Sequence, residues 1–196
     1  MRRKVFDTLL TTGGLVVTVV LLIAGGLLMW GHNFANSNVH DQLAQQQIFF
    51  PAKGSPALAP ADIGPYLNKY AGQQLLTGQQ AKAYADHFIA VHLSEIAAGK
   101  TYAQVSTAAQ ANPNDAALKA QQTTLFQGTT LRGLLLEGYA FWEMGQIALI
   151  AAICSFVLAG VMLVLALLGF WHLRKVPETA EVLASHKGQS LKPAMV

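Results

Sequence analysis

The chain has 196 residues, of which 53% are hydrophobic and only 12% are charged, and its formal net charge is +3. Soluble domains usually carry about 25% charged residues, so this composition excludes an ordinary soluble domain and indicates a membrane protein. The positive excess lies at the two chain ends rather than in a basic patch, which argues against nucleic-acid binding.

The first hydrophobic run, residues 8–31, contains 24 residues without a charge, and about 20 suffice to cross a bilayer. A signal peptide is the alternative, because Arg2, Arg3 and Lys4 precede the run. However, signal h-regions have about 7–15 residues and end at a small-residue cleavage site, which is not found here. We therefore predict a cytoplasmic N-terminus, residues 1–7, and a transmembrane helix, residues 8–31.

Two glycine pairs lie inside this predicted span. Gly13, Gly14, Gly25 and Gly26 are predicted to be helix-packing positions, because small residues let two helices approach closely in lipid. The alternative is simple tolerance, since glycine is common in membrane helices.

Residues 32–143 form the predicted extracytoplasmic domain, with six basic and seven acidic residues. Asn36, Ser37 or Asn38 is predicted to cap a short helix that ends at Pro51. The segment 51–65 contains four prolines and two glycines, which predicts an irregular, mobile loop.

Three more helices are predicted from their end signals. Pro65 starts a short helix that ends before Gly72. Thr77 caps a longer one that ends near Gly99, and Thr101 caps another that ends before Pro113. No proline occurs between Pro113 and Pro177, which allows a single helix to run from Asn114 or Asp115 into the second span.

The second predicted span is residues 144–171, a run of 28 uncharged residues, followed by a tail, residues 172–196. Ala151, Ser155 and Ala159 recur every four residues and are predicted to be helix-packing positions. Basic residues flank both spans on the terminal sides, which predicts that both termini are cytoplasmic. Trp30 and Trp142 would mark the outer interface and Trp171 the inner one.

No segment alternates with a period of two, so the predicted fold is all-α: two transmembrane helices flanking a helical extracytoplasmic domain. The single cysteine, Cys154, lies in the second span, which excludes an intramolecular disulfide. The predicted helices carry glutamines where soluble helices use charges. These predict either a neutral solvated face or a charge-poor protein interface.

The segment Tyr84–Ile96 holds the residues that a metal site would need. His87, His92 and Glu95 are the candidates, with Asp86 beside them. On a regular helix His92 lies about 140° around from His87, so only His92 and Glu95, three residues apart, could bind one ion. We therefore expect these residues to be a core histidine and a solvated face rather than a metal site.

Other catalytic patterns are absent from the sequence. It has no Walker A loop, no G-x-G-x-x-G, no G-x-S-x-G and no C-x-x-C. We predict no enzymatic activity, no catalytic or cofactor-binding residues and no cofactor.

The segments WGHNFANSNVHDQLAQQQIFFP, KYAGQQLLTGQQAKAYADHFIAVHLSEIAAGKTY and TLFQGTTLRGLLLEGYAFWEMGQIAL resemble a family of actinobacterial two-span membrane proteins of unknown function. The resemblance covers nearly the whole chain. Members of that family are sometimes labelled automatically as aromatic ring-opening dioxygenases. Such enzymes use two converging histidines and a carboxylate, which His87, His92 and Glu95 do not match, so the label has no support in these residues.

Three functions follow as expectations. The first is a non-catalytic protein of the bacterial plasma membrane that self-associates or contacts another envelope membrane protein through its outward domain. The second is a ligand-binding or sensor module that works with a separate partner. The third is a metal-dependent enzyme. Beyond the lipid bilayer, the sequence names no partner, ligand or oligomeric state.

Overall fold

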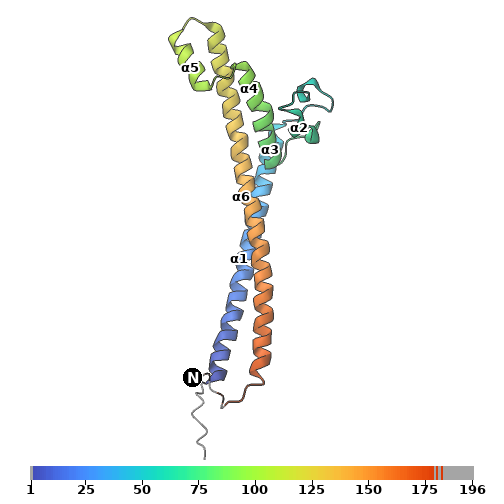
Figure 1. The fold of residues 1–196 in the computed structure, drawn as a ribbon, viewed down its shortest axis with the longest axis vertical. Coiled ribbons are helices and arrows are strands. Elements are labelled where there is room, and N and C mark those ends of the chain that lie inside the picture. Colours follow the sequence, from blue (N-terminus) through green and yellow to red (C-terminus); the bar gives the residue numbers. More distant parts are fainter. Residues whose placement is uncertain (1, 179, 181, 183–196) are drawn as a thin grey trace, which may run out of the picture. The chain divides into compact units, whose positions relative to one another are not determined.

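The computed structural model describes residues 2–178, 180 and 182, and every regular element in them is helical (Figure 1). The helices are α1 (Arg3–Gln46), η1 (Pro56–Leu58), α2 (Gly64–Leu67), η2 (Asn68–Tyr70), α3 (Gly78–Tyr84), η3 (Ala85–Ile89), α4 (Ala90–Ile96), α5 (Tyr102–Ala111) and α6 (Ala116–Leu173). The predicted all-α class is confirmed. α1 and α6 are each long and apolar enough to cross a membrane.

The chain divides into two compact units. The first, the paired-helix unit, comprises Met1–Leu27 and Ala151–Val196, and the second, the helical unit, comprises Leu28–Ile150. α1 and α6 contribute to both units, and the shorter helices all belong to the helical unit.

The short helix predicted to begin at Asn36, Ser37 or Asn38 is wrong as a separate element. α1 continues through these residues without a break and ends at Gln46, where Gln47 takes a left-handed conformation (φ 50°) before Pro51 is reached. An N-cap needs an extended backbone. Here the side chain of Asn36 instead contacts His32 and Gln146.

The proline-rich segment contains more contacts than an irregular loop would suggest. Ser55 caps η1 by accepting a hydrogen bond from the amide of Ala57 (3.3 Å), and Leu58 and Ile63 are buried in the core. A side chain at Gly64 would collide with the carbonyl oxygen of Leu58. Packing of these apolar side chains therefore fixes the segment onto the domain.

The other three helix starts predicted from local signals are confirmed. Pro65 lies in the first turn of α2, and Thr77 and Thr101 form capping boxes with Gln80 and Gln104. Each hydroxyl accepts a bond from the amide three residues on, and each glutamine side-chain oxygen accepts a bond from the cap amide. Gly72 (φ 72°) and Gly99 (φ 77°) end their helices in the left-handed conformation, as predicted.

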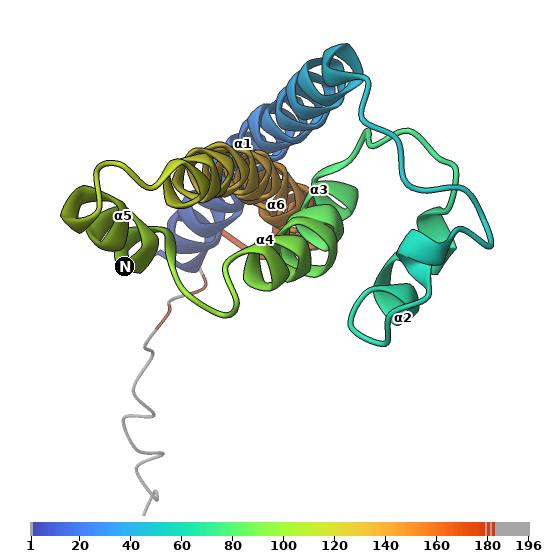
Figure 2. The ribbon, with the colours of Figure 1, turned by 90° about the horizontal axis from the view of Figure 1, so that it is seen from above.

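A π-helix interrupts the long helix predicted after Thr77. η3 links α3 to α4 through i to i+5 bonding, with the amide of Ala90 donating to the carbonyl of Ala85. Figure 2 shows α3 and α4 along α6, with α2 on the far side of α3. The wider turn of the π-helix rotates all side chains that follow it around the helix axis. The angles predicted for a regular helix therefore do not apply beyond η3.

Large apolar side chains fill the core of the helical unit. Its most completely buried members are Ile63, Leu67 and Leu75, packed with residues of α1, α3 and α6. A smaller cluster of Ala97, Val105 and Leu125 holds α5. Two glycines allow α6 to come close: Gly78 faces Trp142, which is half-buried, and Gly128 faces Leu93.

The paired-helix unit packs through small residues. On α6 the buried positions are Ala152, Ala159 and Ala166, seven residues apart, and on α1 Thr11 and Thr18 are buried with the same spacing. A seven-residue spacing is typical of two helices that wind around each other. The hydroxyls of Thr11 and Thr18 donate to carbonyls one turn earlier (2.7 and 2.9 Å), so their burial leaves no donor unpaired.

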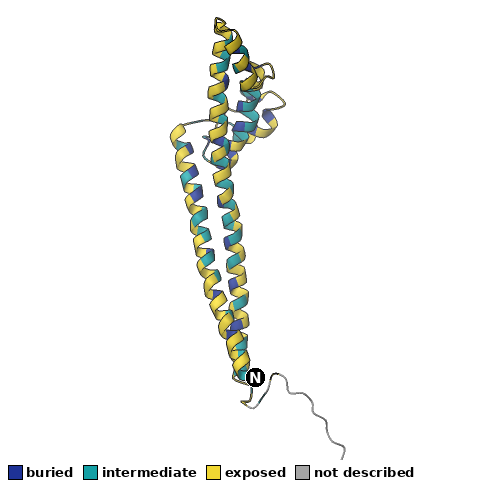
Figure 3. Ribbon diagram, turned by 90° about the vertical axis from the view of Figure 1, so that its left-hand side faces the viewer, coloured by how far each residue is buried: buried dark blue, intermediate teal, exposed yellow. Residues whose placement is uncertain are grey.

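The predicted helix-packing glycines fall into two groups. Gly25 lies against Phe156, and Gly14 lies near Met162 and Ala166, whereas Gly13 and Gly26 have space for a side chain. On α6, Ala159 is buried, and Ala151 and Ser155 are half-buried beside the seven-residue row. Only 11% of each helix's apolar window is buried, and Figure 3 shows large exposed faces.

Candidate functional site

His87 is held by an aromatic stack. Its ring lies parallel to that of Tyr66, with centroids 3.5 Å apart and an interplanar angle of 4°. The stack joins η3 to α2, two elements that are separated by the sequence of η2 and α3. His87 therefore packs against its neighbour rather than presenting an open ligand set.

His92 is bonded within its own helix. Its Nδ1 lies 2.7 Å from the carbonyl oxygen of Phe88, so this nitrogen must donate, and the two rings pack at 4.4 Å. Glu95 is exposed one turn further along α4. Only the Nε2 of His92 stays free for a ligand, which is one donor where a catalytic metal needs about three.

These placements do not bring His87, His92 and Glu95 together. Among residues 2–178, 180 and 182, no group of three or more His, Cys, Asp or Glu side chains is arranged to hold a metal. The π-helix changes the angle between His87 and His92 from that of a regular helix, but the rings contact different residues.

Asp86 forms the main ion-pair cluster of the helical unit. Lys82 Nζ lies 2.7 Å from Oδ2, and Arg132 Nη2 lies 2.9 Å from Oδ1. Burial raises the pKa of this carboxyl, but the hydrogen bonds from Lys82 and Arg132 outweigh burial and lower it below its ordinary value. The bond to Asp86 correspondingly raises the pKa of Lys82.

The cluster also explains how the π-helix is supported. Arg132 Nε donates to the carbonyl of Ala85 at 3.3 Å, so this carbonyl accepts a second bond besides that of Ala90. Asp86 binds two cations, Lys82 and Arg132, and Arg132 also bonds the backbone of Ala85, so the cluster ties η3 to α6. Asp86 is thereby engaged and is not a free base.

An aromatic cluster lies next to η3. Phe50 packs against Tyr70 (5.1 Å) and Tyr84 (5.4 Å), and Tyr84 packs against Phe88 (4.7 Å). Burial raises the pKa of Tyr84. A phenol whose pKa is raised by burial alone is a weaker acid, so this cluster is suited to packing rather than to proton transfer.

A second polar cluster links α1 to α6 within the helical unit. His32 Nδ1 lies 2.9 Å from the carbonyl of Gly145, and its Nε2 lies 3.1 Å from Asn36 Nδ2. Gln146 donates to Asn36 Oδ1 at 3.2 Å. A neutral histidine protonated on Nδ1 satisfies all of these bonds. Gly145 allows the approach, since a side chain there would meet Ala35.

Several glutamines have roles that neither sequence interpretation included. Gln80 is buried at the cap of α3, Gln74 donates to the carbonyl of Ala44 (2.9 Å), and Gln121 donates to that of Ile96 (2.6 Å). Gln122 bonds Ser106 at 2.9 Å. These amides connect helices to one another, and the glutamines at the end of α1 are left on the surface.

A groove of ligand size, with a volume of about 410 Å³, lies between α1 and α6 within the helical unit. α6 supplies an apolar wall that includes Leu131, Leu134 and Phe141. α1 supplies an edge of amides, among them Asn38 and Gln42. We call this the α1–α6 groove. Small-molecule sites have volumes of about 300–1,000 Å³ and are mostly apolar with a few polar groups.

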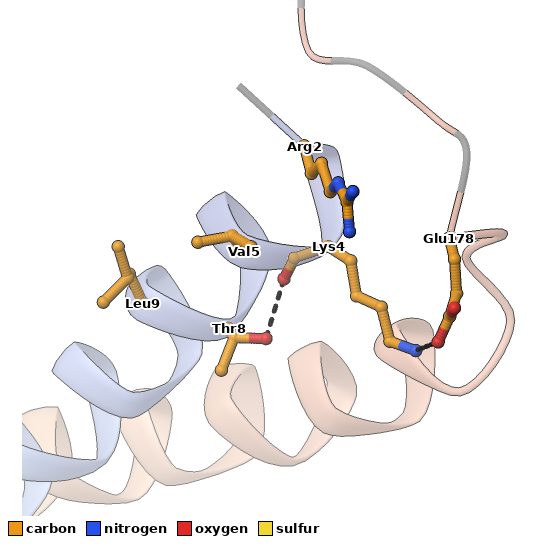
Figure 4. A pocket seen from close by; sticks show the side chains of 6 residues that line it. All are labelled: Arg2, Lys4, Val5, Thr8, Leu9 and Glu178. Carbon is orange, nitrogen blue, oxygen red and sulfur yellow. Dashed lines mark hydrogen bonds and ion pairs between the residues drawn. The ribbon is translucent and has the colours of Figure 1, made fainter.

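A smaller pocket of about 370 Å³ lies in the paired-helix unit at the start of α1. Figure 4 shows Lys4 reaching Glu178 (3.0 Å) and the hydroxyl of Thr8 donating to the carbonyl of Lys4 (2.7 Å). Its charged groups are largely exposed, so the ion pair adds little to stability. Nothing in this pocket forms a reactive pair.

Comparison with protein-family models, with curated proteins and with solved structures found no match to this chain. The resemblance stated from the sequence therefore stays an expectation.

Sequence reasoning missed the α1–α6 groove. Its residues lie about 90 positions apart in the chain, and neither half is recognisable alone. One signal was present: Leu131, Leu134 and Phe141 precede the second span as large apolar residues outside the predicted membrane segment.

Proposed function

We propose that this chain is a non-catalytic, two-span protein of a bacterial plasma membrane, with both termini in the cytoplasm. Its helical unit acts as an interaction module, either as an accessory to another envelope membrane protein or within a homo-oligomer.

The observation that supports this proposal most is how the ionisable side chains are used. Asp86 is paired with Lys82 and Arg132, and the rings of His87 and His92 contact Tyr66 and Phe88. Catalysis needs groups that are free to react with a substrate and poised near the working pH. An interaction module needs only a stable scaffold and exposed surface.

The composition of residues 32–143 agrees with this role. Thirteen charges, six basic and seven acidic, are distributed over this segment. The centres of protein interfaces are depleted in charged residues. A charge-poor helical surface is suited to a partner that also lies at the membrane.

The proposal is tested by native mass spectrometry of particles extracted gently from membranes, with metals measured on the same sample. A stoichiometric second protein would establish an accessory subunit, and a defined homo-oligomer would establish self-association. A monomer with a tightly bound metal that the His92→Ala variant loses would overturn the proposal in favour of an enzyme. The His40→Ala variant, on the exposed side of α1, is the matched control.

Ligand binding is the second candidate function, and the α1–α6 groove favours it. A helical module between two spans would then bind a small molecule and transmit its presence to a partner. In this form of the proposal, that partner is a separate chain.

A further inference from the structure

The wall that α6 contributes to the α1–α6 groove is apolar and exposed. Leu134 is 60% exposed, Leu131 38% and Phe141 36%, and all three side chains line the groove. Covering such side chains removes apolar surface from water, which favours binding. The groove therefore offers substantial binding energy to a hydrocarbon that fills it.

The opposite edge of the groove is polar but uncharged. Gln42 Nε2 donates to Asn38 Oδ1 at 2.7 Å, which leaves the amide hydrogens of Asn38 and the carbonyl oxygen of Gln42 available. Glu137 is the one charged side chain among the lining residues, and no lysine or arginine is among them. An anionic headgroup would meet no cation there, whereas a hydroxyl, an ester or an amine would find partners.

An aromatic row connects the groove to the predicted first span. Trp30 stacks on Phe34 with centroids 5.7 Å apart, and Phe34 packs edge-on against Phe141 at 6.4 Å. Trp30 and Phe34 are 67% and 52% exposed, and Phe141 lines the groove. Trp30 is at the end of the predicted span, residues 8–31, and aromatic residues concentrate at the membrane surface.

We propose that the α1–α6 groove binds the hydrocarbon chain of an amphiphile drawn from the bilayer, with an uncharged or amine-bearing head at the Asn38–Gln42 edge. The apolar wall takes the chain, the aromatic row provides an apolar route from the membrane, and Glu137 disfavours an anionic head. This inference rests on the ligand-binding form of the proposed function.

Two glycines of α6 make a matched pair for testing this site. Gly138 lines the groove, Gly133 does not, and a side chain would meet no atom within 4 Å at either position. The Gly138→Leu variant should fill the groove, and the Gly133→Leu variant should leave it open. Both changes replace glycine with a better helix former, so neither should unfold α6.

The experiment is photocrosslinking of the full chain in lipid nanodiscs with a diazirine-bearing monoacylglycerol, followed by mapping of the labelled peptides. Labelling is expected at residues 131–141 in the wild type and in Gly133→Leu. It should fall about tenfold in Gly138→Leu, which corresponds to about 1.4 kcal/mol of binding. The analogue bearing a phosphate on the glycerol should label these residues less.

Three outcomes would overturn the inference. Equal labelling of wild type and Gly138→Leu would show that the groove is not the site, and stronger labelling by the phosphate analogue would refute the selectivity. Loss of self-assembly in Gly138→Leu, without lipid labelling in the wild type, would show that a second copy fills the groove. If the extracted protein is a monomer without partners but is labelled as expected, the proposed interaction role is refuted and the lipid-binding inference stands.

Discussion

The two units of this protein pack by different rules. In the paired-helix unit the buried positions are alanine, threonine and glycine, including Ala152, Ala159 and Thr18. In the helical unit small residues such as Ala81 are buried too, but large side chains join them, of which Leu67 and Leu75 are completely buried.

The proposed placement of the paired-helix unit in the membrane, with the helical unit in water, accounts for this difference. In water, burying large apolar side chains drives association at about 25 cal/mol per Å². In lipid that driving force is missing, so helices associate by close approach, which small residues allow. The large apolar residues of the paired-helix unit accordingly point outward, as the exposed faces of α1 and α6 show (Figure 3).

The largest expected effect comes from emptying the core of the helical unit. Leu75 is 0% exposed, and Leu75→Ala should lower the free energy of unfolding of this unit by about 2–5 kcal/mol through lost burial and a residual cavity. Chemical denaturation in detergent, followed by near-UV circular dichroism, measures it. The control Leu134→Ala, at an exposed position, should change stability by less than about 1 kcal/mol. Equal effects would contradict the assigned core.

The next largest effect is expected where α1 and α6 approach closely in the paired-helix unit. Gly25 lies against Phe156, and its neighbour Gly26 has free space. Gly25→Val should cost about 1–3 kcal/mol by overpacking, and Gly26→Val should be nearly neutral. Thermal denaturation of the two variants in the same detergent compares them. A larger loss in Gly26→Val would mean that the other face of α1 is the packed one.

A smaller effect is expected from the ion pairs of Asp86, and it should depend on pH. The pKa of Asp86 is lowered in the folded state, so its contribution is present above the unfolded value of about 3.9 and is lost as the pH falls through the lower folded value. Asp86→Asn should therefore cost about 1 kcal/mol at pH 7 and progressively less below about pH 4. Melting temperatures across this range measure the difference.

The matched control for Asp86→Asn is Asp62→Asn, at an exposed carboxylate. Its difference from the wild type should stay small at every pH. A difference between Asp86→Asn and the wild type that did not shrink in acid would refute the ion-pair account.

An effect of similar size is expected at His87. His87→Ala removes the stack on Tyr66 and should cost about 0.5–1.5 kcal/mol. His87→Phe should restore most of the loss, because an aromatic ring can stack without any ring nitrogen. Failure of phenylalanine to restore stability would indicate that a ring nitrogen of His87 has a function of its own.

Much of the fold was predictable from local signals. The capping boxes at Thr77 and Thr101 and the terminal glycines at Gly72 and Gly99 act within one turn, so their residues suffice to identify them. The two apolar helices were predictable from length and composition.

The remaining features depend on contacts between distant residues. The π-helix is supported by Arg132, 47 positions after Ala85 in the chain, and α1 continues past Asn36 where that side chain contacts Gln146. The α1–α6 groove likewise needs two helices to exist. No local pattern encodes such pairings, so sequence periodicity could neither locate the groove nor correct the geometry of the histidine segment.

The central claim is that residues 32–143 lie outside the membrane between two spans. It is tested most directly by cysteine labelling in intact cells, after Cys154→Ser removes the single native thiol. Gln79→Cys and Val182→Cys place thiols at exposed positions of the helical unit and of the tail. The account predicts that a membrane-impermeant maleimide labels Gln79→Cys in intact cells and Val182→Cys only after permeabilisation. Labelling of both positions in intact cells, or of Val182→Cys alone, would contradict it.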